Sequence, residues 1–163
     1  MKYNTTRFGE IAVPKEEEIL FSEGLIGFKD KKKYTILTHR ENSPLFWLQS
    51  LEDPKTAFII MSPLLFLPHY LADVCKHIDW EIKEENFSDF SVYGIMVIDK
   101  EGEKQQILMN LLAPLVIDQK KMMGKQVIIN NSTYQVAEPI SPYIQQITNT
   151  FTSIKNKLNN VKK

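Results

Sequence analysis

The chain has 163 residues and no net charge, because 20 basic side chains balance 20 acidic ones. A hydrophobic share of 43% excludes a wholly disordered chain, and the length predicts one domain of ordinary size. The neutral balance provides no overall field toward nucleic acid or an anionic membrane. Cys75 is the only cysteine, so an internal disulfide and a four-cysteine zinc site are excluded.

The sequence shows neither a signal peptide nor a membrane span. The first ten residues contain no long apolar run. The most apolar stretch, residues 57–67, is interrupted by Ser62 and Pro63 and is shorter than the roughly 20 residues that cross a bilayer. We therefore expect a soluble cytoplasmic protein, and the lone thiol fits a reducing compartment.

The first half of the chain is predicted to form short strands, because apolar or alternating runs are separated by turn residues. Gly24 and Gly27 enclose apolar residues and predict a tight loop over 22–28 whose apolar side chains still reach a core. Residues 30–33 are polar and predict one helical turn, whereas 64–67, bracketed by prolines, predict a loop or edge segment. The predicted strands cover residues 3–13, 18–21, 34–38, 45–51 and 57–61.

The second half is also predicted to be mostly β. Residues 70–82 carry apolar side chains at helical spacing and allow a short helix. Four of the following strands are expected to pair as two hairpins, the first around a turn at 100–103 and the second around a turn at 119–124. The predicted strands cover residues 91–99, 105–112, 115–118, 126–129 and, after a turn at 130–132, 134–137.

The last segment changes to an amphipathic helix. Its apolar residues from Ile144 onward recur in steps of three and four. Ser141 is a suitable N-cap and Pro142 a suitable first helical residue. The general rule is that such a stripe packs on the β domain; the alternative is that its outer half docks a partner. The stripe consists of Ile144, Ile147, Phe151, Ile154, Leu158 and Val161.

No pattern for catalysis or cofactor binding is found. His39, His69 and His77 lie in different segments, and none pairs with another at a metal-ligand spacing. Cys75 on an apolar helical face is typical of a small buried residue rather than a nucleophile. The Gly24–Gly27 loop lacks the third glycine and following helix of a dinucleotide site. We expect no enzyme, no metal, no cofactor and no direct nucleic-acid binding.

Four segments in order resemble the FliW family of bacterial flagellar assembly factors. They are TRFGEI at 6–11, FSEGLIGF at 21–28, FWLQSLEDP at 46–54 leading into AF at 57–58, and NLLAPLVI at 110–117 leading into GKQVI at 124–128. The resemblance covers residues 3–139. One departure is Ile26, where many members are expected to carry proline.

The resemblance implies a compact antiparallel β-barrel-like domain over residues 1–140, without enzymatic activity. The helix over 141–163 is then part of the same unit. Members of the family bind flagellin and also bind CsrA, the carbon-storage regulator that represses translation. The two partners compete, so export of flagellin frees the factor to sequester CsrA. The factor binds CsrA at a site away from the surface that CsrA uses to bind RNA, and flagellin translation resumes. We expect the free protein to be monomeric.

A switch between two protein partners needs exposed anchors, and interface anchors are enriched in aromatic residues. The candidate anchors are Phe28, Phe46, Trp47, Phe66 and Tyr70. A second group is expected to shape loops rather than touch a partner: Gly24, Gly27, Asp53, Pro54, Asn110 and Pro114.

Two other readings of the same pattern are an oligonucleotide- or oligosaccharide-binding β-barrel and a flavin-binding split-barrel enzyme. Steep salt dependence of nucleic-acid binding favours the first. A colourless purified protein counts against the second.

Overall fold

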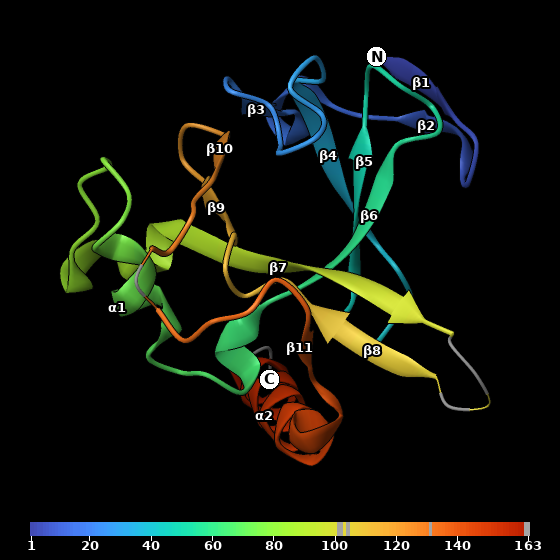
Figure 1. Cartoon of the computed structure of the whole chain (residues 1–163). Coiled ribbons are helices and arrows are strands. Elements are labelled where there is room, and N and C mark those ends of the chain that lie inside the picture. Colours follow the sequence, from blue (N-terminus) through green and yellow to red (C-terminus); the bar gives the residue numbers. More distant parts are fainter. Residues whose placement is uncertain (101–102, 104, 131, 162–163) are drawn as a thin grey trace.

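The structure, a computed structural model, describes the whole chain except residues 101–102, 104, 131 and 162–163. Its central feature is a sheet whose strands curl until β9 pairs back onto β7, which closes a barrel (Figure 1). The ring runs in the order β3 (Ile19–Phe21), β4 (Lys33–Thr38), β5 (Phe46–Ser50), β6 (Ala57–Met61), β7 (Phe90–Asp99), β9 (Leu115–Asp118) and β10 (Met123–Gln126). The mostly-β barrel with a C-terminal helix is thus confirmed.

One pairing departs from the expected antiparallel arrangement. Among the described strands, β3 and β10 run parallel, with Met123 opposite Leu20 and Gly124 opposite Phe21. The ring contains an odd number of strands. Up-and-down alternation cannot close around an odd ring, so one neighbouring pair must be parallel.

Strand β7 separates two hydrophobic cores. Tyr93 and Ile95 pack against the core inside the barrel, whereas Val92 and Met96 pack in a second core on its outer side. Successive strand residues point to opposite faces, so alternate side chains of β7 enter the two cores. The outer core also contains side chains of β8 (Gln106–Met109), which pairs with β7. Strand β11 (Glu138–Pro139) pairs with β8, and Ile140, which follows β11, is buried in the same core.

The N-terminal segment is a hairpin rather than the single strand predicted over 3–13. Its strands are β1 (Lys2–Thr5) and β2 (Gly9–Ala12). The chain reverses before Gly9, which has a φ of +69°, and the Thr5 hydroxyl accepts the N–H of Phe8 at 2.8 Å. The hairpin lies at the end of the molecule opposite α2 (Figure 1).

Other predicted elements shift. Residues 30–33 form a turn and the start of β4 instead of a helical turn, and the 64–67 segment contains a 3-10 turn at Pro63–Leu65. The second strand of the second hairpin is displaced to β10, and residues 134–137 are not a strand. The turns predicted at 100–103 and 130–132 fall partly outside the described residues. Further 3-10 turns lie at Lys15–Glu17 and Glu84–Asp89.

Two helices cover the outer core. The short helix allowed over 70–82 is α1 (Tyr70–Cys75), and the amphipathic stripe forms α2 (Ile144–Val161), preceded by a 3-10 turn at Ser141–Tyr143. Ser141 lies inside that turn and is not its N-cap, a position that Ile140 takes without a side-chain hydrogen bond. Within the described residues, no helix combines the length and apolarity needed to cross a bilayer.

Candidate protein-binding surface

The barrel core is incompletely enclosed. Its buried centre includes Phe21, Tyr34 and Leu48, but around them lie apolar side chains that remain partly exposed. We call these partly buried residues the apolar face. They are Phe28, Ile36, Phe46, Phe58, Tyr93, Ile95 and Met122.

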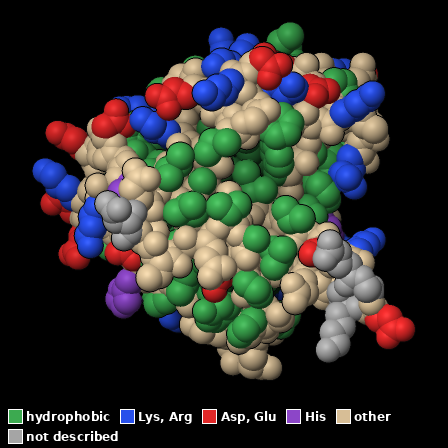
Figure 2. Space-filling view, viewed as in Figure 1, with side chains coloured by type: hydrophobic (Ala, Val, Ile, Leu, Met, Phe, Trp, Pro, Cys, Tyr) green, Lys and Arg blue, Asp and Glu red, His purple; other side chains and the backbone are tan. Residues whose placement is uncertain are grey.

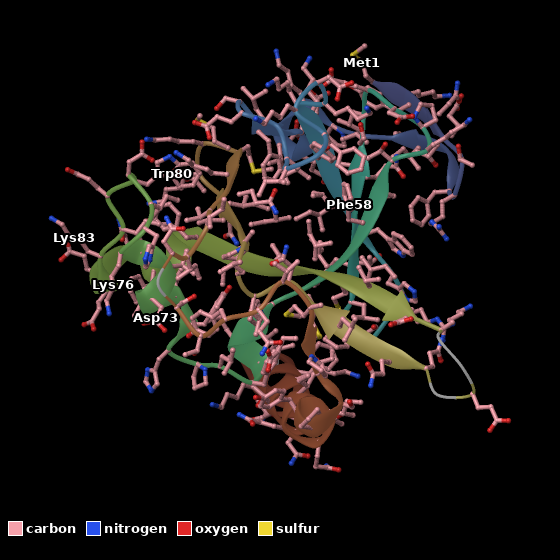
Figure 3. All side chains as sticks on the ribbon, viewed as in Figure 1. Met1, Phe58, Asp73, Lys76, Trp80 and Lys83 are labelled. Carbon is pink, nitrogen blue, oxygen red and sulfur yellow. The ribbon has the colours of Figure 1, made fainter. Side chains whose placement is uncertain are left out.

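Hydrophobic side chains gather across the middle of one face of the molecule, with charged side chains along its upper and left edges (Figure 2). Phe58 lies among the barrel strands, whereas the charged side chains of Asp73, Lys76 and Lys83 lie around α1 (Figure 3). Apolar side chains gathered on one face, with charged side chains at its edges, are typical of a site for another protein.

The apolar face contains two pairs of aromatic rings in contact. The ring of Phe28 meets Phe58 edge to face with centroids 5.0 Å apart, and Phe46 meets Tyr93 in the same way at 6.1 Å. Each pair joins segments that are distant in the sequence. Such pairs hold the rings in place, so a partner meets rigid aromatic surfaces that need little further ordering.

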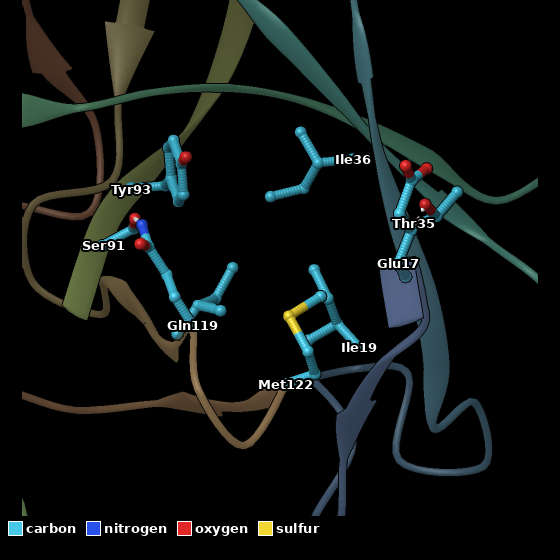
Figure 4. A pocket seen from close by; sticks show the side chains of 9 residues that line it. Glu17, Ile19, Thr35, Ile36, Ser91, Tyr93, Gln119 and Met122 are labelled. Atoms are coloured by element: carbon cyan, nitrogen blue, oxygen red, sulfur yellow. Dashed lines mark hydrogen bonds between the residues drawn. The ribbon is translucent and has the colours of Figure 1, made fainter. Parts of the chain in front are cut away.

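A cavity of about 170 Å³ opens beside Tyr93 of the second pair. Ile36 and Met122 face Tyr93 and Gln119 across it (Figure 4). Two internal hydrogen bonds lie at its edge: the amide of Gln119 donates to the Ser91 hydroxyl, and the Thr35 hydroxyl donates to the carbonyl of Glu17 at 3.1 Å. A dry apolar cavity of about 150 Å³ holds benzene. The space therefore suits one apolar side chain of a partner.

The loop between β3 and β4 positions Phe28. Gly24 has a φ of +67°, and a Cβ there would lie 2.7 Å from the Cα of Lys29, so only glycine fits. Gly27 has a φ of +84° but open space around it. The loop is held by a hydrogen bond from the N–H of Ile26 to Gln126 Oε1 at 2.8 Å. Ile26 itself is exposed, while the neighbouring Leu25 is buried.

Charges lie next to the Phe28 ring. Lys31 Nζ is 5.8 Å from its centroid and also contacts Asp30 Oδ2 at 3.1 Å and Asp53 Oδ2 at 3.9 Å. The hydroxyl of Thr56 donates to Asp53 and holds the pKa of that carboxyl below its usual value, aided by the backbone N–H of Lys55. Lys31 lowers the pKa of Asp30 mainly through their hydrogen bond. Both acids therefore stay ionised beside the aromatic pair.

Three of the five predicted anchors are buried away from the apolar face. Trp47 points outward from β5 and is covered by the N-terminal hairpin, with the Arg7 guanidinium 4.3 Å from its ring and Phe8 at 5.7 Å. Phe66 and Tyr70 lie in the outer core. The structure presents only Phe28 and Phe46 as partly exposed anchors.

The outer core fixes Phe66 and Tyr70 by specific contacts. Phe66 stacks on Tyr143 at 4.7 Å between centroids. Tyr70 packs edge to face on Tyr134 at 5.0 Å, and its hydroxyl donates to the carbonyl of Leu111. These contacts tie the start of α1 and the turn before α2 to neighbouring loop segments in the outer core.

The remaining motif residues lie in turns. Asp53 accepts the N–H of Lys55 at 3.1 Å, and the carbonyl of Pro54 accepts the N–H of Thr6 from the N-terminal hairpin at 2.9 Å. Asn110 Oδ1 accepts the N–H of Ala113 at 2.9 Å, and the carbonyl of Pro114 accepts the N–H of Val127 at 2.9 Å. All four contacts hold the ends of strands.

Sequence reasoning missed Phe58 and Tyr93. The run 57–61 is apolar throughout, which hides the alternation that turns Phe58 inward beside Leu48. The sequence does indicate that Tyr93 and Val92 point to opposite faces, because they are neighbours in the clearest predicted strand. Which of the two faces opens to solvent depends on the rest of the barrel.

Comparison with known proteins places the chain in a family. The family model described as FliW protein matches residues 2–140. The flagellar assembly factor FliW of Thermoanaerobacter pseudethanolicus is 32% identical over 154 residues, which is 94% of this chain and 99% of that protein. The flagellar assembly factor FliW of Bacillus licheniformis is 36% identical over 140 residues, which is 86% of this chain and 96% of that protein.

A solved structure agrees with this result. The crystal structure of a flagellar assembly factor FliW superposes with a TM-score of 0.68 at 24% identity, over 88% of this chain and 99% of that one, so the two share a fold. The similar proteins are named as assembly factors and not as enzymes. The chain described here therefore belongs to the FliW family.

Proposed function

We propose that this protein binds flagellin and, when free of flagellin, binds and antagonises the translational regulator CsrA. Release of flagellin then relieves repression of flagellin translation. The protein acts in the cytoplasm as a monomer without catalysis, and residues 1–140 form the partner-binding unit. Membership of the FliW family supports this role at the level of flagellar assembly.

The observation that carries the proposal is the apolar face. It offers partly exposed aromatic rings and, beside one of them, Tyr93, a cavity of about 170 Å³, which together suit a protein segment rather than a charged polymer. Burying such anchors supplies most of the affinity in protein interfaces. Competition between flagellin and CsrA follows if each partner needs this one face.

Isothermal titration tests the proposal. Purified protein is titrated with CsrA and then with flagellin as competitor. We expect saturable binding of CsrA that flagellin displaces, with no turnover of either partner. Absence of heat and of co-elution with both proteins would contradict the proposed function while leaving the fold assignment intact.

A further inference from the structure

Helix α2 carries an apolar stripe that the body of the protein buries at Ile147 and partly covers at Phe151, while Ile144 at its start is 48% exposed. Ile147 is 6% exposed and belongs to the outer core. The start of the helix is held further by the stacking of Tyr143 on Phe66 and by a hydrogen bond from Gln146 Nε2 to the carbonyl of Phe66 at 3.2 Å. The body of the protein thus anchors the helix at its first turns.

The second part of the stripe projects to solvent. Ile154 is 45% exposed, Leu158 59% and Val161 84%. They follow Ile147 and Phe151 in alternating steps of four and three, which is the spacing of the a and d positions of a coiled coil. We call this row of exposed aliphatic side chains, Ile154, Leu158 and Val161, the free stripe.

Lysines flank the free stripe on both sides. With Ile154 and Val161 at d and Leu158 at a, Lys155 takes an e position and Lys157 a g position. The helix Ile144–Val161 contains no Asp or Glu. Since e and g residues select the partner of a coiled coil by charge, the stripe favours a helix with acidic residues there.

From this pattern we infer that α2 is a second docking site, where the free stripe pairs with an acidic amphipathic helix of a partner protein. The inference goes beyond the proposed function, because the family model ends at residue 140, before α2 begins. The contact is a short one of about one heptad, from Ile154 to Val161, so it adds to binding elsewhere rather than replacing it.

A second copy of α2 fits the stripe poorly. Pairing two such helices places lysines against lysines at the e and g positions, with no carboxylate on either helix to offset the repulsion. The charge pattern therefore selects a different chain.

A bilayer also fits poorly. An interfacial helix buries its whole apolar stripe in the membrane plane. Here Ile147, on the same stripe, is already buried against the body of the protein. The stripe therefore cannot lie in a membrane surface over its whole length.

The test uses two synthetic helical peptides of about 21 residues and the full-length protein. One peptide carries leucine at a and d with glutamate at e and g; the other differs only by lysine at e and g. Fluorescence anisotropy is expected to show saturable binding of the acidic peptide. Leu158→Gln should weaken this binding by about tenfold or more, and Lys155→Glu with Lys157→Glu should transfer the preference to the basic peptide.

Val136→Gln is the matched control, because Val136 is an exposed aliphatic residue, 61% accessible, outside α2. It should leave peptide binding unchanged. Equal affinity for both peptides, or binding that survives Leu158→Gln, would overturn the inference. Sedimentation that reveals self-association lost in Leu158→Gln would assign the stripe to a second copy, and binding to phosphatidylglycerol vesicles lost in the same variant would assign it to a membrane.

Titration of Leu158→Gln with CsrA and flagellin separates this inference from the proposed function. Unchanged binding of both shows that α2 acts apart from the apolar face. A failure of the unmodified protein to bind CsrA and flagellin would leave the peptide result standing.

Discussion

The ring of Phe28 contacts that of Phe58 edge to face, with 5.0 Å between centroids and 81° between planes. Phe28 comes from the loop after β3 and Phe58 from β6, so this contact fixes the loop over the barrel core. Aromatic pairs of this geometry contribute roughly 0.5–1.5 kcal/mol beyond the area they bury. This contact sets where the Phe28 ring lies on the apolar face.

We expect Phe28→Ala to weaken binding of flagellin and of CsrA by about tenfold or more, because it removes an anchor and loosens Phe58. The matched control is Phe8→Ala. Phe8 is also a half-buried phenylalanine, but it packs on Trp47 on the outer side of the barrel. Titration calorimetry on both folded variants measures the difference. Equal losses in the two variants would remove the apolar face from the interface.

We expect substitution by alanine to lower the stability of the fold more at Gly124 than at Gly94. A Cβ at Gly124 would lie 2.4 Å from the buried ring of Phe21. A Cβ at Gly94 would lie 2.5 Å from Cγ of the buried Met109, an unbranched side chain with three rotatable bonds, and 3.3 Å from the carbonyl oxygen of Asn110. Overpacking against a fixed ring costs about 1–3 kcal/mol. Urea unfolding should show that Gly124→Ala lowers the free energy of unfolding by about that amount and that Gly94→Ala lowers it by less. The reverse order would mean that the Phe21 ring moves easily.

We expect loss of the side-chain hydroxyl to have different effects on the free energy of unfolding at the buried residues Tyr34 and Tyr70. The Tyr34 hydroxyl is buried without a hydrogen-bond partner among the described atoms, whereas the Tyr70 hydroxyl donates to Leu111. Removing an unpaired buried hydroxyl is neutral or stabilising, but removing a paired one leaves a carbonyl unsatisfied and costs about 1 kcal/mol. Urea unfolding of Tyr34→Phe and Tyr70→Phe compares them. A clear loss in Tyr34→Phe would point to a bound water at that hydroxyl.

Alkaline pH should destabilise the fold through Tyr34. Burial raises the pKa of this phenol to about 12, with the carboxylates of Glu52, Asp30 and Asp53 adding to the shift. In the unfolded chain the pKa is about 10. Between these values the folded state keeps a proton that the unfolded state releases, so the free energy of unfolding falls as pH rises from about 10 to about 12.

Unfolding at a series of pH values measures this dependence. Below about pH 10 both states hold the proton and Tyr34 contributes no slope. Tyr34→Phe should flatten the decline, while part remains because burial and the hydrogen bond to Asp73 raise the pKa of Tyr134 to about 12 as well. An identical decline in Tyr34→Phe would show that this phenol does not titrate with unfolding.

Local patterns in the sequence determined the elements that depend on neighbouring residues. The alternation in 91–99 identifies β7, the apolar run 57–61 identifies β6, and the steps of three and four identify α2. Each is decided within a few residues by the strand or helix period. The hairpin of β1 and β2 was missed because its only turn signal, Gly9, also fits a bulge.

The tertiary structure alone decided which faces are covered. Trp47 and Phe46 are neighbours in β5, yet the N-terminal hairpin buries the first while the second stays partly open on the barrel's inner side. The parallel pairing of β3 with β10 likewise arises only when the ring closes. The sequence by itself therefore determined the strands, the helix and their apolar stripes. Burial and pairing were left to the assembled barrel, because they depend on contacts between segments far apart in the chain.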